Sequence, residues 1–160
     1  MNPSIAEILL SEEPGQAVAN ALKEFLVRDL YLLNVDANER TLTHRIALYL
    51  QNEFPEWDVD CEYNRDNHEP KELMLFGGEP DSYDTVAQTV FPDIIVHRRG
   101  TAENYLVIEF KKTTSQISDR KDFDKLHAFK GQFAYKYALF IELLTGSSEG
   151  GVPRAEWVHG

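Results

Sequence analysis

Residues 91–111 read FPDIIVHRRGTAENYLVIEFK, and this stretch decides the fold. Two apolar runs, at 94–96 and 106–108, lie on either side of a turn-rich segment at 99–102, a pattern typical of a β-hairpin. It predicts one strand over 91–97 and a second over 105–111. If the turn centres on Thr101, Asp93 lies directly opposite Glu109.

This register gives the hairpin a chemically distinctive face. Directly opposed residues share a face, with Cβ atoms about 4.5–5.5 Å apart. Lys111 emerges on the same face, whereas Phe110 points to the opposite face and into a core layer. Two carboxylates this close repel unless a cation lies between them, and oxygen ligands suit Mg²⁺. The residues therefore predict metal-assisted phosphodiester hydrolysis: Asp93 and Glu109 hold the ion, and Lys111 positions the nucleophile or stabilises the phosphorane.

The same residues also have structural interpretations. Asp93 follows a proline and would suit the start of a strand. Glu109 and Lys111 would suit a solvated strand face with a cross-strand ion pair. These alternatives stay open at the level of sequence.

The segments around the hairpin predict an α/β layer arrangement. Apolar residues recur at spacings of three and four through the first half, and alternate over 57–63. The expected elements are helices at 5–9, 18–33 and 36–55, a strand at 57–63, a long connection over 64–90 with a short helix near 73–76, a helix from Ser118 or Asp119 through Phe129, and a final strand at 137–144. After Gly146 we expect a loose tail.

At this point the residues resemble a known family. Pro92-Asp93, fifteen intervening residues and then Glu109-Phe110-Lys111 are similar to the PD-(D/E)xK signature of the restriction-endonuclease-like nucleases. The length of 160 residues predicts a single domain over 1–160. The resemblance covers about 36–144 and implies a restriction-endonuclease-like core there, with a mixed central sheet of about four strands flanked by helices. It leaves unexplained the N-terminal helical extension over 1–35 and the tail over 145–160.

The resemblance also implies an activity and a cofactor. Members cleave nucleic acid with Mg²⁺ or Mn²⁺, and DNA more often than RNA. The backbone carbonyl of Phe110 would be a further metal ligand, and Glu39 resembles the additional carboxylate that many members supply from a preceding helix. Glu39 also stands three residues after Asp36, the spacing of a helix capping box, so a cap and a metal ligand are equally weighted roles.

Four basic residues are candidates for contacts with phosphates. They are Lys112 beside the hairpin motif, Arg98 and Arg99 at its turn, and Arg65 after the first strand. Strand ends and turns carry such residues in any case, so a purely structural role is the alternative for each.

The net charge of −11 excludes non-specific electrostatic binding of nucleic acid over the whole surface of the molecule. The excess acid is concentrated in residues 1–80, which hold 6 Lys or Arg against 16 Asp or Glu. Residues 97–136 hold 9 Lys or Arg against 5 Asp or Glu, so the predicted active segment is locally basic. We therefore expect weak, salt-sensitive binding to DNA, or reliance on a homodimer or a larger complex for affinity.

Other features limit the remaining function classes. A single cysteine, Cys61, gives neither an intramolecular disulfide nor a zinc motif, which fits a reducing cytoplasm. No apolar run approaches the length of a membrane span. Motifs of small-molecule enzymes, such as a Gly-rich phosphate loop, do not occur. The rival to a nuclease is a catalytically silent binding or assembly module on the same fold, in a restriction or defence complex.

Overall fold

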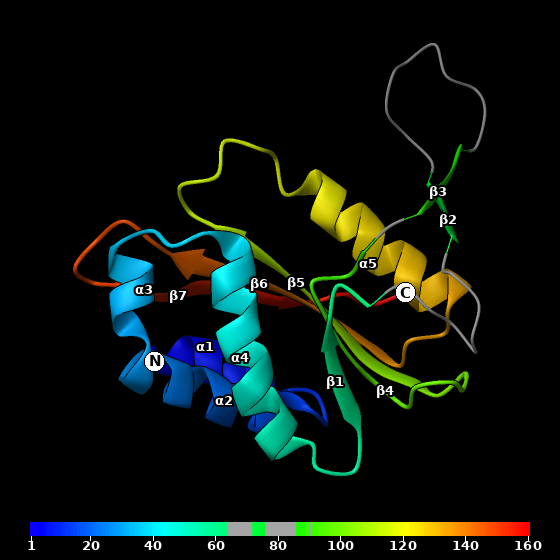
Figure 1. Cartoon of the computed structure of the whole chain (residues 1–160), viewed down its shortest axis with the longest axis horizontal. Coiled ribbons are helices and arrows are strands. Elements are labelled where there is room, and N and C mark those ends of the chain that lie inside the picture. The colour runs from blue at the N-terminus through cyan, green and yellow to red at the C-terminus, as the bar shows by residue number, and fades with distance from the viewer. Residues whose placement is uncertain (64–71, 76–85, 90) are drawn as a thin grey trace.

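The computed structural model describes residues 1–63, 72–75, 86–89 and 91–160. They form an α/β fold around a five-stranded mixed sheet with strand order β1-β4-β5-β6-β7 (Figure 1). The predicted fold class is therefore confirmed at the level of a mixed sheet flanked by helices. The sheet has one strand more than the sequence predicted.

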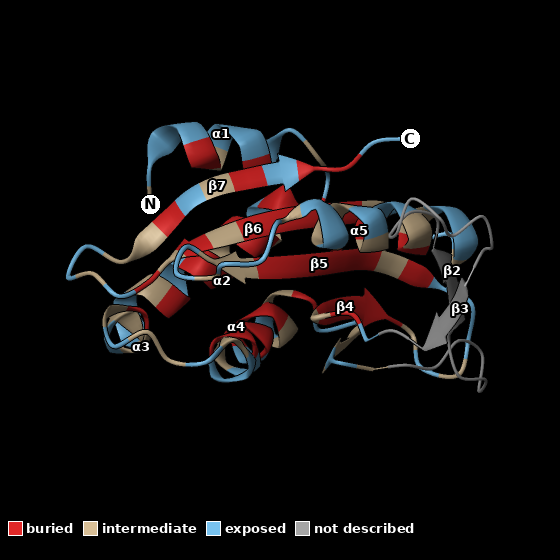
Figure 2. Cartoon of the chain, turned by 90° about the horizontal axis from the view of Figure 1, so that it is seen from above, coloured by how far each residue is buried: buried red, intermediate tan, exposed pale blue. Residues whose placement is uncertain are grey.

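Strands β4 (Ile94–His97) and β5 (Asn104–Lys112) form the predicted hairpin. Ile94 pairs with Ile108 and Val96 with Leu106, which is the register expected from a turn centred on Thr101. The register shifts between Val96 and His97, near the turn. Strand β5 is buried along almost its whole length at the centre of the sheet (Figure 2), which explains its nearly continuous apolar sequence.

The chain after the hairpin completes the sheet. Helix α5 (Arg120–Gln132) is a crossover that returns the chain to β6 (Tyr137–Leu144), which lies parallel to β5 with the bounds that the sequence predicted. Strand β7 (Gly151–Trp157) then pairs with β6 in the antiparallel sense. The expectation of a loose tail was wrong.

Strand β7 was missed because its sequence lacks a clear period of two. Its buried residues are Val152, Ala155 and Trp157, so the spacing changes from three to two. Pro153 argues against a central strand, but β7 lies at the sheet edge, where a proline is tolerated.

The first half of the chain is helical, as predicted, with different boundaries. The helices are α1 (Pro3–Leu10), α2 (Gly15–Arg28), α3 (Leu30–Asn34) and α4 (Glu39–Glu53). The helix expected over 18–33 is broken at Asp29, which accepts a hydrogen bond from Arg45 and thereby ties this break to α4. The predicted capping box is also wrong: Asn38 caps α4 by accepting a hydrogen bond from Thr41 N at 2.8 Å, and Asp36 has a positive φ of 55°.

Two apolar cores lie on the two faces of the sheet. Helices α1, α2 and α4 cover one face, onto which β5 directs Leu106, Ile108 and Phe110. Helix α5 covers the other face, onto which β5 directs Val107. Because successive residues of a strand point to opposite faces, Glu109 and Lys111 point toward α5.

Strand β1 (Asp58–Cys61) pairs with β4 at the other edge of the sheet, within the segment predicted as a strand. Strands β2 (Glu72–Leu75) and β3 (Val86–Thr89) form a separate antiparallel pair, so the short helix expected near 73–76 was wrong. The remainder of the predicted 64–90 connection lies outside the described residues. In the described part of the chain, no helix has the length and apolar character needed to cross a membrane.

Candidate active site at the start of β4

The Asp93 and Glu109 carboxylates are interlocked with the backbone of the two strands that carry them. Asp93 N donates a hydrogen bond to Glu109 Oε2 at 2.9 Å, and Phe110 N donates one to Asp93 Oδ2 at 2.8 Å. These contacts follow from the predicted register, which brings the two residues opposite each other. One oxygen of each carboxylate is therefore held by a main-chain amide, which orients both groups.

Burial of Glu109 excludes the interpretation of a solvated strand face for this residue. Its exposed fraction is 0%, and Phe110 is buried in the opposite core, as the alternation predicted. Burial raises the pKa of Glu109 well above its ordinary value, and the neighbouring Asp93 raises the pKa further. The ionised form of Glu109 therefore needs a cation close by.

Two lysines supply positive charge, and they pair with α5 in a crossed pattern. Lys125 of α5 forms an ion pair with Glu109 of β5, and Lys111 of β5 lies 3.0 Å from Asp122 of α5. We call Glu109, Lys111, Asp122 and Lys125 the charge quartet. Lys125 Nζ also donates a hydrogen bond to Phe91 O at 3.0 Å, which ties α5 to the residues before β4.

The sequence interpretation did not assign Asp122 and Lys125 to the site. A signal was present: the two residues are three apart, on the helical face that also carries the buried Leu126 and Phe129. Charged residues on the buried face of this helix indicate that the helix packs against polar groups there and not only against an apolar core.

Glu39 lies at the first position of α4, beside the other acids. Because Asn38 caps this helix, Glu39 is not used in a capping box. Burial first, and then repulsion by Asp93 and Asp122, raise the pKa of Glu39 to about 7. Glu39 and Asp93 share a cleft of about 330 Å³, which is lined by Asn38, Glu39, Arg40, Thr43, Glu62 and Asp93. A larger depression of about 400 Å³ lies between α2 and α4 and includes none of the predicted site residues.

The donor chemistry of the site fits a hard divalent cation. Fully ionised, Glu39, Asp93, Glu109 and Asp122 exceed the charge of the two lysines by two. Glu109 Oε1 and Asp122 Oδ2 are buried, and each has a lysine ammonium as its partner. Within the same residues, no three His, Cys, Asp or Glu side chains already form a group that could hold a metal ion. The acids are present, but Glu109 and Asp122 are each paired with a lysine.

The three candidates for phosphate contacts that the structure describes, Lys112, Arg98 and Arg99, do not gather at this site. Lys112 points to the opposite face of the sheet, where Nζ donates to Ala37 O at 3.1 Å and pairs with Asp36 at 3.1 Å. Arg98 and Arg99 lie at the turn, at the far end of β4 from Asp93. Arg65 lies outside the described residues.

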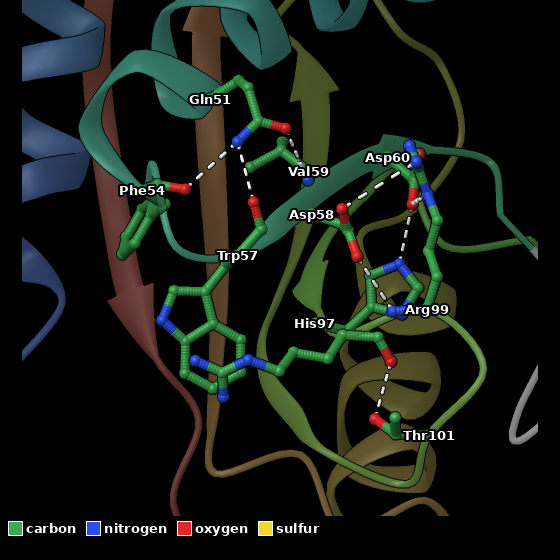
Figure 3. A network of polar contacts seen from close by, with 10 residues as sticks. Gln51, Phe54, Trp57, Asp58, Val59, Asp60, His97, Arg99 and Thr101 are labelled. Atoms are coloured by element: carbon green, nitrogen blue, oxygen red, sulfur yellow. Dashed lines mark hydrogen bonds and ion pairs between the residues drawn. The ribbon is translucent and has the colours of Figure 1, made fainter.

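A second polar network occupies this far end of the hairpin (Figure 3). Arg99 Nε donates to Asp60 Oδ2 at 2.9 Å, and His97 Nε2 lies 2.7 Å from the same oxygen. Arg99 N donates to Asp58 Oδ2 at 3.0 Å. Burial alone would raise the pKa of Asp60, but the hydrogen bonds from His97 and Arg99 outweigh burial and lower the pKa to about 2.

The candidate site thus combines two oriented carboxylates, two further acids, two lysines and an adjoining cleft. Carboxylates are the ligands that hard divalent cations take, and ammonium groups can stabilise negative charge on a phosphate. Comparisons of the chain with protein-family models, with curated proteins and with solved structures find no match of any of the three kinds.

Proposed function

We propose that this chain is a Mg²⁺- or Mn²⁺-dependent nuclease with a restriction-endonuclease-like core, and that it hydrolyses phosphodiester bonds. The observation that carries the proposal is the interlocked pair Asp93 and Glu109, with Lys111 on the same face of the hairpin. The choice of DNA rather than RNA as the substrate rests on the resemblance to PD-(D/E)xK nucleases.

The residues of the site divide the work in this proposal. Asp93 and Glu109 would hold the divalent ion, with the Phe110 carbonyl and Glu39 as further candidate ligands. The bound ion would lower the pKa of a water molecule and offset the charge of the phosphate. Lys111 would leave Asp122, orient the attacking water and stabilise negative charge that develops on the phosphate oxygens.

The charge distribution supports a nuclease that binds nucleic acid weakly by itself. The −11 net charge opposes a phosphate backbone, and Arg98 and Arg99 are already paired with Glu103 and Asp60. We propose that affinity comes from the bound metal, from a homodimer or from a larger complex. DNA binding by the chain alone should then be weak and should weaken further as the salt concentration rises.

Cleavage of a labelled DNA oligonucleotide with Mg²⁺ or Mn²⁺ tests the proposal. Asp93→Asn and Lys111→Met should each lower the rate at least about 100-fold, since each removes a group that acts on the reacting phosphate. Matched controls are Asp124→Asn and Lys121→Met, both exposed on α5. A rate that the Asp93 and Lys111 variants leave unchanged belongs to a contaminant and contradicts the proposal, as does an inactive wild-type protein.

The second candidate is a catalytically silent binding or assembly module. It is favoured by the charge quartet, because Glu109 and Asp122 are each already neutralised by a lysine across the β5–α5 contact. Calorimetric titration with Mn²⁺ separates the two candidates. A nuclease should bind the ion and lose binding in Glu109→Ala, whereas a module with permanent lysine partners should bind none in either form.

A further inference from the structure

The pairing of Lys125 with Glu109 takes up the Glu109 oxygen that no main-chain amide holds. Glu109 Oε2 accepts a hydrogen bond from Asp93 N, so Oε1 is the oxygen left to contact a cation. Lys125 Nζ is paired with Oε1 and is held there by a second contact, to Phe91 O. The Lys125 side chain is only 17% exposed, so it is not a surface lysine that reaches inward by chance.

We propose that Lys125 is an internal counter-ion that a divalent cation must displace, so that Lys125 and the metal compete for Glu109. This inference rests on the proposed function, because it assumes that Asp93 and Glu109 form a metal site. It assigns Lys125 a positioning and regulatory role that the sequence motif does not include.

The physical basis is the cost of a buried charge. Glu109 is fully buried, and an ionised carboxylate without a partner is strongly unfavourable there. Lys125 removes this cost while the metal is absent and so stabilises the empty site. Once an ion bridges Asp93 and Glu109, the ammonium is a like charge within a few ångströms and is repelled.

The charges around Lys125 indicate where it goes after displacement. Asp93 and Asp122 both act on its ammonium, and Asp122 lies three residues earlier on the same helix. Once displaced, Lys125 therefore keeps Asp122 as a nearby acid but loses the two contacts, to Glu109 and Phe91 O, that hold its ammonium in place. Four acids, two lysines and one divalent ion also sum to zero, which allows the complete site to be neutral.

Calorimetric titration of Mn²⁺ at pH 8 tests the competition. Lys125→Met keeps the length of the side chain and removes its charge, so it should bind Mn²⁺ at least about tenfold more tightly than the wild type. Lys125→Arg keeps the charge and should bind like the wild type. The control Lys121→Met removes an exposed charge on the same helix and should change the affinity less than about twofold. Equal or weaker binding by folded Lys125→Met overturns the inference.

A second measurement uses the unaltered protein, in case Lys125→Met does not fold. Amine-reactive labelling with mass spectrometry should show Lys125 protected in chelator and labelled several-fold faster with saturating Mn²⁺, while Lys121 stays constant. Unchanged labelling of Lys125 overturns the inference.

The outcomes also distinguish the two proposals. If cleavage depends on Asp93 but the Lys125 and Lys121 variants bind Mn²⁺ as tightly as the wild type, only the proposed competition between Lys125 and the metal is overturned. Tighter binding by Lys125→Met without any cleavage removes only the nuclease. Absence of Mn²⁺ binding in every variant overturns both.

Discussion

The two ends of the β4–β5 hairpin carry polar networks of opposite character. At the turn, Asp60 is matched by Arg99 and His97, and its pKa falls to about 2. At the other end, burial and neighbouring acids raise the pKa of Glu39 to about 7 and that of Glu109 well above its ordinary value. A lowered acid pKa means that the fold favours the ionised carboxylate, and a raised one means that it disfavours it.

This difference teaches which network serves stability and which is suited to a ligand. The turn network neutralises its own acids, so its charges strengthen the attachment of edge strand β1 to β4. The site at the start of β4 keeps more acid than base, and this uncompensated charge lowers the free energy of unfolding. Perturbed acids of this second kind are typical of functional sites. The predictions below test the contrast by removing charges from each end.

The largest effect on stability should come from the turn network. Asp60→Ala removes the shared partner of His97 and Arg99, and His97 is only 2% exposed. We expect the free energy of unfolding to fall by about 3 kcal/mol, because a buried polar group loses its partner. Urea denaturation measures the change. Asp124→Ala on the exposed side of α5 is the control, and a loss below about 1 kcal/mol for Asp60→Ala would contradict the assignment.

The same network should appear in the pH dependence of stability. The pKa of Asp60 is lowered from its ordinary 3.8 to about 2 in the folded state, so its contribution is complete above about pH 4 and is lost as the pH falls toward 2. After allowance for partial exposure, the contribution is about 1–2 kcal/mol. Denaturation of the wild type and of Asp60→Asn at several pH values should show a difference that narrows over this range. A constant difference down to pH 2 would show that the charge of Asp60 is not responsible.

The hairpin that carries the site could be predicted because its signals are local. Apolar runs on both sides of a turn define the register, and the register alone places Asp93 beside Glu109. Strand β6 was equally clear, because it is a continuous apolar run with a definite start and end. Both are cases in which neighbouring residues carry all the information.

The features that were missed depend on residues far apart in the chain. Lys125 reaches Glu109 only because α5 packs on one particular face of β5. Asp60 meets Arg99 only because β1 pairs with β4, and no local period encodes this pairing. Strand β7 has little strand character in its own sequence, and it forms because its backbone pairs with β6.

At the start of β4, removal of an acid should raise the free energy of unfolding, whereas removal of Asp60 at the turn should lower it. Glu39→Gln removes a carboxylate whose ionisation is disfavoured, so the free energy of unfolding should rise by about 1 kcal/mol at pH 8, a value reduced for solvent screening. Because the folded pKa of about 7 exceeds the ordinary 4.5, the destabilisation sets in as the pH rises through this interval. At pH 4 the variant and the wild type should therefore be equal. Glu56→Gln, an exposed acid, serves as the control in thermal denaturation, and a destabilised Glu39→Gln would remove the contrast between the two ends.

The smallest effect should come from Arg98, which also lies at the turn but outside the Asp60 network. Its guanidinium lies 4.1 Å from the centre of the Trp57 ring and pairs with the exposed Glu103. An exposed cation–π contact is worth about 0.5–1 kcal/mol, so Arg98→Ala should lower the free energy of unfolding by about 0.5 kcal/mol. Fluorescence anisotropy with labelled DNA should show an unchanged affinity and salt slope, because Arg98 lies at the far end of β4 from Asp93. A weaker affinity with a shallower salt slope would instead mean that the turn contacts phosphates, and the stabilising end of the hairpin would then have a second role.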